Sequence, residues 1–387
     1  MSQSISLTIV MPCLNEADTL AACIQKARLG LERAGVAGEI LIADNGSTDG
    51  SIEIGEKLGA RVVRVKEKGY GQALKGGIEA AQGKWIIMGD ADDSYDFSDI
   101  AGFVKKLGEG HELVMGCRLP AGGGKVLPGA MPFSHRWIGN PMFTLMARHM
   151  FASPIHDVYC GLRAFTRELY DRLDLRCTGM EFATEMLIKS SLTGSRIAEV
   201  PITLHPDGRK AHAPHLKTFR DGWRTLRFFL VFSPRWLFLY PGILLVLLGL
   251  IGYAVAMPGI PIGGIRFDAH TLLFSSLAVL LGYQSILFAV FAKTFAINEG
   301  LLPVDVNLKR FFEIMYLERG LMLGGVTFVF GIALLAAAVV QWWQVHFGSL
   351  DYAHTMRWVI PGVMLTALGF QTILSSFFVS ILGMKRR

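Results

Sequence analysis

Residues 85–97 read WIIMGDADDSYDF, and this stretch decides the fold prediction. Its apolar run Trp85–Met88 is short and bounded by turn formers, as is typical of a buried strand. Asp90, Ala91 and Asp92 follow directly beyond Gly89. In an open α/β sheet, ligands bind just beyond the carboxyl ends of the strands, where clustered carboxylates repel one another unless a cation lies between them. Because Mg²⁺ takes one or two carboxylates together with substrate phosphates, Asp90 and Asp92 predict a Mg²⁺ or Mn²⁺ site.

Strands and helices alternate on both sides of this stretch. Further strands are predicted at residues 7–11, 40–43, 61–65, 113–116 and 198–204. One helix is predicted to end at about Ala34, with Asn15 or Asp18 as its cap. A second helix follows the loop NGSTDGS, a third runs to about Gln82, and a fourth covers residues 98–107. This alternation predicts a mostly parallel sheet with Asp44 and Asp90 at its carboxyl edge. Asp96 and Asp99 are interpreted as a solvated cap of the helix that starts near Ser98.

The chain of 387 residues is long enough for two domains, and its composition changes along its length. We predict a soluble α/β domain over residues 1–208, a basic interfacial segment over 209–235 and a membrane domain over 236–387. All five cysteines lie in the first domain and show no CxxC spacing, which favours a reducing compartment without disulfides.

The interfacial segment is predicted from a basic amphipathic pattern. It has seven Lys or Arg side chains against one acid, Asp221. Apolar side chains recur at helical spacing, namely Leu216, Phe219, Trp223, Leu226 and Leu230. A basic amphipathic helix of this kind lies in a membrane interface, whereas packing on the soluble domain is the alternative.

Four apolar segments follow, at about residues 236–257, 271–292, 321–340 and 358–384. Each is long enough to cross about 30 Å of hydrocarbon. LGYQSILF from Leu281 resembles LGFQTILS from Leu368, so we interpret the region as two related helical hairpins. Gln284 and Gln371 occupy matching places, and an interhelical hydrogen bond is the favoured interpretation for them.

Lys and Arg are concentrated before Trp236, in residues 293–319 and in the tail 385–387, whereas residues 258–270 and 341–357 carry only Arg266 and Arg357. The positive-inside rule therefore predicts a multi-pass protein of the cytoplasmic (inner) membrane with its catalytic domain and both termini in the cytosol.

Four blocks in this order, PCLNE, ADNGSTDGS, KGYGQALKGG and MGDADDSYDF, resemble the family 2 glycosyltransferases of GT-A fold. Within that family, the chain is most similar to dolichyl-phosphate mannose synthase and related polyprenyl-phosphate glycosyltransferases, over roughly residues 5–210. The predicted fold is therefore a GT-A α/β catalytic domain joined to a helical membrane domain with four transmembrane helices.

The resemblance implies a set of donor residues. The nucleotide sugar would contact residues from all four blocks, namely Pro12, Asn15, Glu16, Asp44, Ser47, Lys68, Gly71, Asp90 and Ala91. Asp90 and Asp92 would hold the metal on the diphosphate, with Asp92 counted among the catalytic residues.

The resemblance also implies an acceptor site. The segment DVYCGLR matches a motif D-x-x-x-G-x-R that lies near the reacting sugar in the family. The catalytic candidates there are Arg118, Arg136 and Asp157. The acceptor phosphate would be held by cations, namely Arg118, Arg136, Arg163, Arg209 and Lys210. For each arginine, a surface ion pair is the alternative. Glu181 and Glu185 share one helical face and are either catalytic or an acidic surface.

The expected reaction is the inverting, metal-dependent transfer of a hexose of mannose or glucose type from a nucleotide diphosphate sugar to a dolichyl or undecaprenyl phosphate at the bilayer; no nucleic acid is an expected partner. A phosphate acceptor is already largely ionised at pH 7 and needs cations, whereas a hydroxyl acceptor needs a carboxylate base such as Asp157. Two alternatives remain. A polysaccharide-extending synthase would carry a Q-x-x-R-W block, but Phe232 stands where its glutamine belongs before Arg235-Trp236. A non-catalytic lipid-binding protein would not need the acidic cluster.

Overall fold

The computed structural model describes residues 5–209, 218–259, 261, 263–265 and 267–384. The chain forms two compact units, Met1–Phe229 and Leu230–Arg387. The division between them falls inside the segment 209–235 that we predict to be interfacial.

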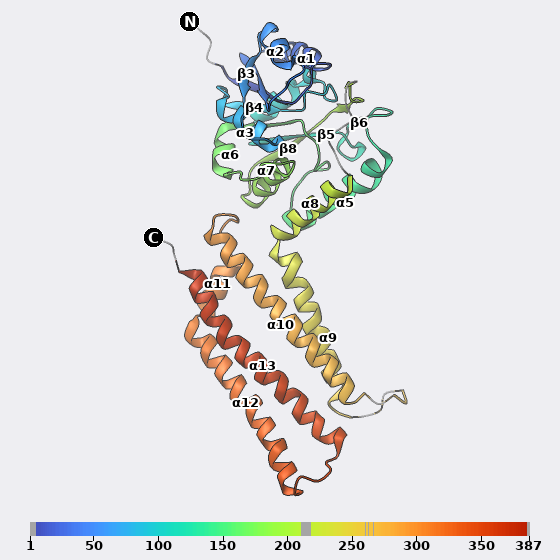
Figure 1. The fold of residues 1–387 in the computed structure, drawn as a ribbon, viewed down its shortest axis with the longest axis vertical. Helices are drawn as coiled ribbons and strands as arrows, with labels where there is room; N and C mark the ends of the chain where they lie inside the picture. The colour runs from blue at the N-terminus through green and yellow to red at the C-terminus, as the bar shows by residue number, and fades with distance from the viewer. Residues whose placement is uncertain (1–4, 210–217, 260, 262, 266, 385–387) are drawn as a thin grey trace. The chain divides into compact units, whose positions relative to one another are not determined.

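The first unit is built on a seven-stranded sheet in the order β3-β2-β1-β4-β7-β5-β8 (Figure 1). Its strands are β1 (Leu7–Cys13), β2 (Gly38–Asp44), β3 (Arg61–Arg64), β4 (Trp85–Met88), β5 (Leu113–Cys117), β7 (Arg163–Thr166) and β8 (Ile197–Pro201). Strand β7 runs antiparallel to its neighbours β4 and β5, and the other pairs are parallel. The prediction of a mostly parallel sheet is confirmed.

Helices cover both faces of this sheet. Helices α1 (Leu20–Ala34), α2 (Ser51–Lys57) and α4 (Ala101–Gly108) pack on one face, where Leu7, Ile9 and Met11 of β1 meet Leu20 and Phe103 in one buried cluster. Helix α7 (Glu181–Leu192) contacts both α3 (Tyr70–Ala80) and α5 (Asn140–Phe151), and α3 also packs against β1 and β2. Helix α6 (Arg167–Leu173) links β7 to α7.

Three local predictions need correction. The predicted strand 198–204 is two strands, because the chain leaves β8 at Pro201 and forms β9 (Thr203–Leu204) against β6 (Lys125–Val126) in a separate two-stranded sheet. The helix predicted to start at Ser98 begins as a 3₁₀ turn capped by the Asp96 carboxylate, which accepts a hydrogen bond from the Ser98 N–H. Helix α1 starts after Thr19, because Asn15 turns the chain with a φ of 60°.

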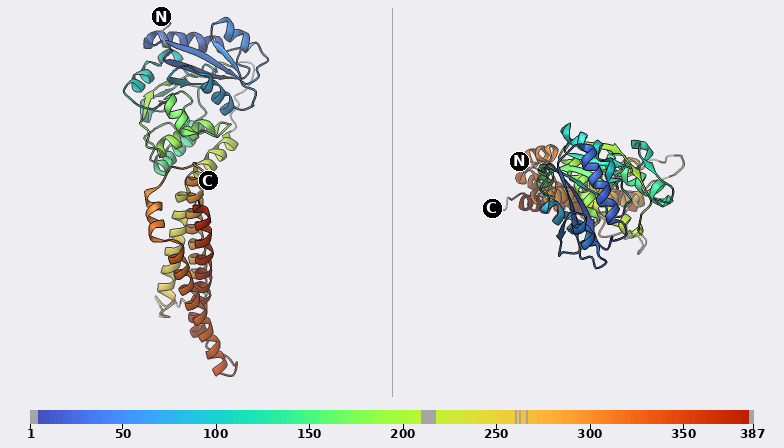
Figure 2. Two further views of the ribbon diagram at one scale, coloured as in Figure 1. Left: turned by 90° about the vertical axis from the view of Figure 1, so that its left-hand side faces the viewer. Right: turned by 90° about the horizontal axis from the view of Figure 1, so that it is seen from above.

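The second unit contains long apolar helices that lie side by side in both views (Figure 1 and Figure 2). In the described part of the chain, four helical segments are long and apolar enough to cross a membrane: Arg235–Ala256, Ala269–Asn298, Leu317–Gln344 and Tyr352–Gly383. They comprise η4 (Arg235–Leu239) with α9 (Tyr240–Ala256), α10 (Ala269–Asn298), α12 (Leu317–Gln344) and α13 (Tyr352–Gly383). Helix α9 packs on α10, α10 on α13, and α13 on α12. A short helix, α11 (Val306–Ile314), separates the two hairpins.

The two hairpins use the same glycine register, which agrees with the repeat predicted from LGYQ and LGFQ. A Cβ on Gly242 would lie 2.8 Å from the Gly282 carbonyl oxygen, and one on Gly324 would lie 3.0 Å from that of Gly369. Small residues at such crossings let helix backbones approach closely in a membrane. Tyr283 of α10 and Thr372 of α13 share a hydrogen bond at 2.5 Å, whereas the buried Gln371 Oε1 has no partner within the described part of the chain. The favoured role for Gln371 is therefore wrong for that oxygen.

The predicted amphipathic segment is partly helix α8 (Thr218–Val231). Trp223 of the predicted apolar stripe is exposed, whereas Phe229 is fully buried and packs edge-on against Phe143 and Phe151 of α5. Near its C-terminal end, this helix therefore packs on the first unit, as the alternative interpretation required. Leu216 lies outside the described residues, as does the side chain of Phe219.

Candidate active site

The carboxyl ends of the parallel strands bring three of the predicted donor residues to one edge of the sheet. Asp44 is the last residue of β2 and lies beside Cys13 of β1, and Asp90 follows β4 by two residues. Glu16 lies in the loop after β1 and is 5% exposed. This clustering follows from the parallel topology, because parallel strands end at the same edge.

Two loops at this edge hold each other in place. The Ser47 hydroxyl accepts a hydrogen bond from the Asn15 N–H at 2.9 Å, and the Asn15 side-chain oxygen accepts one from the Thr48 N–H at 2.9 Å. The Asp44 carboxylate accepts from the N–H groups of Gly46 and Ser47. Asn15, Asp44 and Ser47 therefore shape the predicted nucleotide loop through contacts that sequence spacing alone does not reveal. Pro12 lies within β1, opposite Ala43.

Lys68 and Gly71 continue this loop system. The exposed Lys68 donates from Nζ to the Asn45 carbonyl oxygen at 2.6 Å, so its ammonium lies over the β2 loop. Gly71 is buried, and a Cβ there would lie 2.7 Å from the carbonyl carbon of Thr178. The close approach of that backbone explains why position 71 is glycine. The contact of Gly71 with the nucleotide stays a prediction.

Asp90 has a partner that the sequence analysis missed. The Tyr70 hydroxyl donates to Asp90 Oδ1 at 2.8 Å. Burial, and then the negative charge of Asp92, raise the pKa of Asp90 to about 6. Tyr70 comes from the KGYGQ block, but no spacing rule marks it. Ala91 is buried and its carbonyl oxygen accepts from the Thr19 hydroxyl at 2.6 Å, which fixes the turn between the two aspartates.

Arg209 lies in the middle of the acidic cluster. Its guanidinium contacts Glu16 at 2.6 Å, Asp207 at 2.8 Å and Asp92 at 3.2 Å. The role of Arg209 at the acceptor phosphate stays a prediction, because in this structure its guanidinium pairs with carboxylates of the predicted nucleotide-sugar site. Three carboxylates around one guanidinium leave the cluster with a negative excess. Lys210, the neighbouring candidate, lies outside the described residues.

The chemistry of this cluster fits a hard divalent cation. Asp90 and Asp92 supply carboxylate oxygens. Burial, and then the charge of Asp92, raise the pKa of Asp90, and a bound cation would favour its ionised form. Within the described residues, no group of three or more His, Cys, Asp or Glu side chains is arranged to hold a metal by itself. Mg²⁺ completes its coordination with water and substrate phosphate oxygens, so one or two carboxylates are enough to hold it.

The acceptor candidates Arg118 and Asp157 form a buried ion pair. Arg118 follows the last residue of β5 and donates from Nε and a terminal nitrogen to Asp157 at 2.7 and 2.8 Å, and its N–H adds a third bond at 3.0 Å. Asp157 is fully buried. Burial opposes its ionisation, but the charge and hydrogen bonds of Arg118 outweigh that effect and hold the pKa of Asp157 below its usual range.

Arg163 is a structural residue, which corrects its prediction as a phosphate ligand. It is 1% exposed, and its guanidinium donates to the carbonyl oxygens of Cys160, Val158 and Ala183. Burial lowers the pKa of this guanidinium. Arg163 therefore fixes the turn 157–163 through these backbone carbonyl oxygens, and its buried guanidinium is not exposed to an acceptor phosphate.

Arg136 is the acceptor candidate that retains unused donor capacity. It lies in η3 (His135–Gly139), a π-helical turn that opens α5, with its guanidinium 5.3 Å from the Trp137 ring. Its buried Nε has no hydrogen-bond partner among the described residues. A buried guanidinium nitrogen without an acceptor is costly, so this group is available for an anionic ligand.

Glu181 and Glu185 have different roles, although they share a helical face. The Glu185 carboxylate is 1% exposed, pairs with Lys189 at 2.9 Å and accepts from the N–H groups of Arg176 and Cys177. It is therefore a structural group that shapes the loop packed against Gly71. Glu181 starts α7 and lies 3.9 Å from Arg224.

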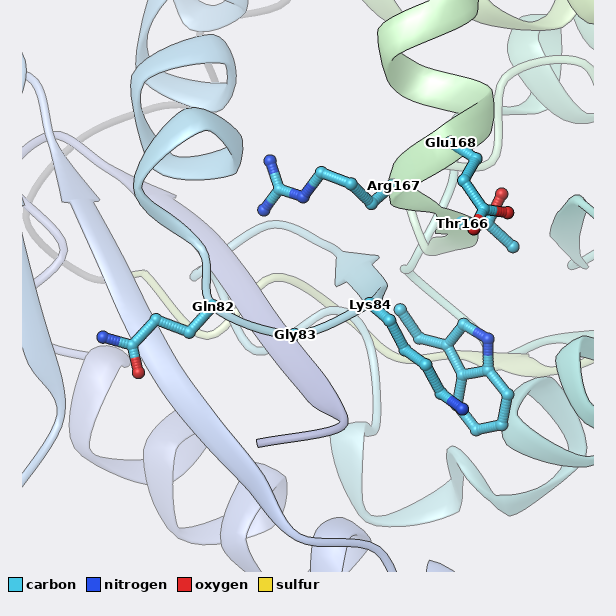
Figure 3. A pocket seen from close by; sticks show the side chains of 7 residues that line it. Gln82, Gly83, Lys84, Thr166, Arg167 and Glu168 are labelled. Atoms are coloured by element: carbon cyan, nitrogen blue, oxygen red, sulfur yellow. The ribbon is translucent and has the colours of Figure 1, made fainter. Parts of the chain in front are cut away.

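One hollow of the first unit lies away from these residues. Figure 3 shows this cavity of about 450 Å³, lined by Lys84, Trp85, Thr166, Arg167 and their neighbours. Trp85 begins β4 and Thr166 ends the antiparallel β7, so the cavity lies at the amino edge of the parallel strands, opposite Asp44 and Asp90. It does not belong to the candidate site.

Comparison with known proteins assigns this chain to a family. Residues 8–174 match the family model described as glycosyl transferase family 2, and residues 290–383 match the family 2 C-terminal transmembrane region. The low-salt glycan biosynthesis hexosyltransferase Agl6 of Haloferax volcanii is 35% identical over 379 residues, which cover 98% of this chain and 89% of that protein. A dolichyl-phosphate hexose transferase of the same organism is 31% identical over 218 residues, covering 56% of this chain and 89% of that protein.

Among solved structures, a glucosyl-3-phosphoglycerate synthase of Mycobacterium tuberculosis matches with a TM-score of 0.46 and 20% identity, over 58% of this chain and 79% of that one. The assignment itself rests on the Haloferax relatives and the family models. The chain belongs to glycosyltransferase family 2 and is a GT-A membrane glycosyltransferase.

Proposed function

We propose that this membrane glycosyltransferase transfers a hexose, of mannose or glucose type, from a nucleotide diphosphate sugar to a polyprenyl phosphate. The observation that carries this proposal is the buried pair of Arg118 and Asp157. Asp157 is the carboxylate that a hydroxyl acceptor would need as its base, and the structure engages both of its oxygens with Arg118. A carboxylate whose pKa is lowered in this way is a poor proton acceptor.

A phosphate acceptor makes no such demand. Its second pKa is about 6, so at pH 7 it is already a nucleophile and requires cations that hold it in line with the bond that breaks. Arg136, whose Nε has no partner among the described residues, would supply such a cation, and an arginine fork matches phosphate geometry. In-line displacement inverts the anomeric carbon. The similarity to a dolichyl-phosphate hexose transferase supports the same acceptor class.

On the donor side, the chain's own groups divide the work. Asp44, Glu16 and the loop tied by Asn15 and Ser47 would orient the nucleotide. Asp90 and Asp92 would hold Mg²⁺ or Mn²⁺, which would neutralise charge on the leaving diphosphate. The Tyr70 hydroxyl keeps Asp90 oriented, and Arg209 balances part of the cluster's charge.

The positive-inside pattern supports a catalytic unit and termini on the cytosolic side of the cytoplasmic membrane. Arg235 and Lys293 both pair with Asp305 in the second unit, at the ends of membrane helices that we assign to the cytosol. A reporter enzyme fused after Arg387 should lie in the cytosol and act only on a substrate supplied on the cytosolic side of the membrane. Activity confined to the other side of the membrane would reverse this topology.

The proposal is tested with membranes that contain the full chain, incubated with each radiolabelled nucleotide sugar and a polyprenyl phosphate. Thin-layer analysis should show one labelled lipid with the mobility of a monoglycosylated prenyl phosphate. The Asp92→Ala protein serves as the control for background transfer. A contrary outcome is that the label enters no lipid and instead enters a growing saccharide, at equal rates with and without the lipid phosphate. That outcome would show saccharide extension in place of the proposed function.

A further inference from the structure

The turn 157–163 lies directly against one of the candidate metal carboxylates. A Cβ placed on Gly161 would lie 3.0 Å from Asp90 Oδ2 and 3.0 Å from the Tyr95 hydroxyl oxygen. The backbone at Gly161 therefore approaches Asp90 so closely that a side chain there would press on the carboxylate. Since Asp157 begins this turn, a residue of the predicted acceptor motif contacts a residue of the predicted metal site.

Tyr95 fixes the middle of this turn from the segment that follows β4. Its hydroxyl oxygen accepts a hydrogen bond from the Gly161 N–H at 2.8 Å, and Tyr95 is 4% exposed. The ends of the turn are fixed from other sides, by Arg118 at the edge of β5 and by the Arg163 guanidinium. The Tyr95 hydroxyl therefore holds the middle of the turn at its distance from Asp90.

The backbone beside Tyr95 is tied to the second metal candidate. Asp92 Oδ1 accepts hydrogen bonds from the Ser94 N–H at 3.0 Å and from the Ser94 hydroxyl at 2.6 Å. The Ser94 carbonyl oxygen accepts from the His205 N–H at 3.0 Å, and Tyr95 forms a β-bridge with Leu204 of β9. These contacts fix the position of Tyr95 relative to Asp92, and its hydroxyl extends that constraint to the turn.

Packing alone does not account for a tyrosine at this position. Phe97, two residues later, is fully buried and fills its place in the core without a hydroxyl. Burial of a hydroxyl is unfavourable unless the group is hydrogen-bonded. Tyr95→Phe would leave the Gly161 N–H without the oxygen that it donates to, which is also costly for a buried donor. The hydroxyl is therefore explained by the turn that it holds.

We propose that Tyr95 is a positioning residue that couples the metal site to the acceptor turn, with Gly161 as the point of contact. Groups that orient a metal ligand change metal affinity although they do not touch the ion. A shift of the turn reaches Asp90 through Gly161, and a shift of Asp90 reaches Asp157 by the same route, because a coupling between two sites is reciprocal. The inference rests on the proposed function only in that the turn serves the acceptor.

The first measurement is Mn²⁺ binding by the full chain in detergent, followed by calorimetry without sugar or lipid. Gly161→Ala adds one methyl group in the acceptor turn, 3.0 Å from Asp90 Oδ2, and should weaken Mn²⁺ binding about tenfold. Gly108→Ala is the matched control, because a Cβ there would meet nothing within 4 Å in the described part of the chain. Its Mn²⁺ affinity should equal that of the wild type.

The second measurement compares two identical chemical changes beside Asp90. At saturating Mn²⁺ and nucleotide sugar, Tyr95→Phe should raise KM for the polyprenyl phosphate about tenfold with little change in kcat, because the turn that carries Asp157 loses a hydrogen bond. Tyr70→Phe should leave that KM unchanged, since the Tyr70 hydroxyl donates to Asp90 and bound Mn²⁺ then holds this carboxylate in place.

Two outcomes would overturn the proposal. Equal Mn²⁺ affinities of the Gly161→Ala and Gly108→Ala proteins would show that the turn does not act on the metal carboxylate. Equal KM values for Tyr95→Phe and Tyr70→Phe would show that the Tyr95 hydroxyl does not position the turn. If Gly161→Ala does not retain the wild-type melting temperature, Tyr95→Phe replaces it in the Mn²⁺ titration and should also bind more weakly. Transfer to a saccharide hydroxyl by the wild type would contradict the proposed function alone, because the Mn²⁺ titration needs no acceptor.

Discussion

The two halves of the sheet's carboxyl edge differ in how many carboxylates each guanidinium neutralises. Glu16 beyond β1 and Asp92 beyond β4 share the guanidinium of Arg209 with Asp207, which follows β9. At the end of β5, Asp157 has a whole guanidinium to itself, that of Arg118. The first half is therefore short of positive charge and suits a metal–diphosphate donor. In the second half, Arg118 balances the charge of Asp157 and engages both of its oxygens, which suits an acceptor that brings its own charge.

Removal of a donor-side carboxylate should break this comparison most severely. Asp92→Ala should lower turnover by about two to three orders of magnitude or more, because charge on the leaving diphosphate loses its stabilisation. EDTA should have the same effect on the wild type. Initial rates of lipid glycosylation in detergent give the measurement, with elution volume and melting temperature as the check on folding. Near-normal transfer in EDTA would exclude the metal assignment.

The acceptor half is tested by Arg136→Ala. Loss of a charge-assisted contact worth roughly 1.5–3 kcal/mol should reduce kcat/KM for the lipid phosphate about ten- to hundredfold. The affinity for the nucleotide sugar, measured by calorimetry, should stay the same because the donor residues lie at the other strands. Arg148→Ala is the matched control, since Arg148 is exposed on the same helix. Equal losses for both variants would mean a general surface effect.

A finer test of the donor half is Tyr70→Phe. The change removes the hydroxyl that donates to Asp90 Oδ1 at 2.8 Å and keeps the ring. A hydrogen bond to a charged group contributes about 1.5–3 kcal/mol, part of which a bound cation replaces. We expect weaker Mn²⁺ binding and transfer lower by about tenfold, with saturating Mn²⁺ restoring part of the rate. A rate loss that Mn²⁺ concentration does not affect would contradict this role.

The smallest effect on chemistry is expected for Asp157→Asn. Its pKa is held below the ordinary carboxyl range, so Asp157 stays ionised throughout the working pH and contributes no limb to the pH–rate profile near neutrality. Transfer per folded molecule should fall by less than about tenfold, whereas loss of a general base costs about 10²–10⁴. Stability should suffer more, because breaking a buried ion pair costs about 3–5 kcal/mol. Abolished transfer in a protein with a normal melting temperature would indicate a hydroxyl acceptor.

Donor-side stability gives the complementary measurement. Arg209→Gln should destabilise the protein without donor or metal, because Glu16, Asp92 and Asp207 lose their shared cation. Added Mn²⁺ should restore the melting temperature more in this variant than in the wild type, since Asp92 is no longer paired. The shift on titration with Mn²⁺, compared between the two proteins, measures this competition. Identical shifts would show that Arg209 and the cation do not share the cluster.

The sequence alone determined the elements that depend on local pattern. Trp85–Met88 became β4 with the predicted bounds, and the acids after it lie at the carboxyl edge, because period and turn residues are local properties. The same holds for the four membrane helices, whose length and lack of charge identify them without tertiary contacts. The family resemblance added the fold and the class of enzyme.

Tertiary structure decided the partners of each charged side chain. Arg118, Arg163 and Arg209 looked alike in sequence, yet the first pairs with a buried carboxylate, the second is satisfied by carbonyl oxygens and the third belongs to the donor cluster. Arg209 and Glu16 are 193 residues apart, a contact that no spacing rule encodes. Which role an arginine takes depends on the groups that folding brings within about 3 Å of it and on how far burial removes water, and neither property is local in the chain.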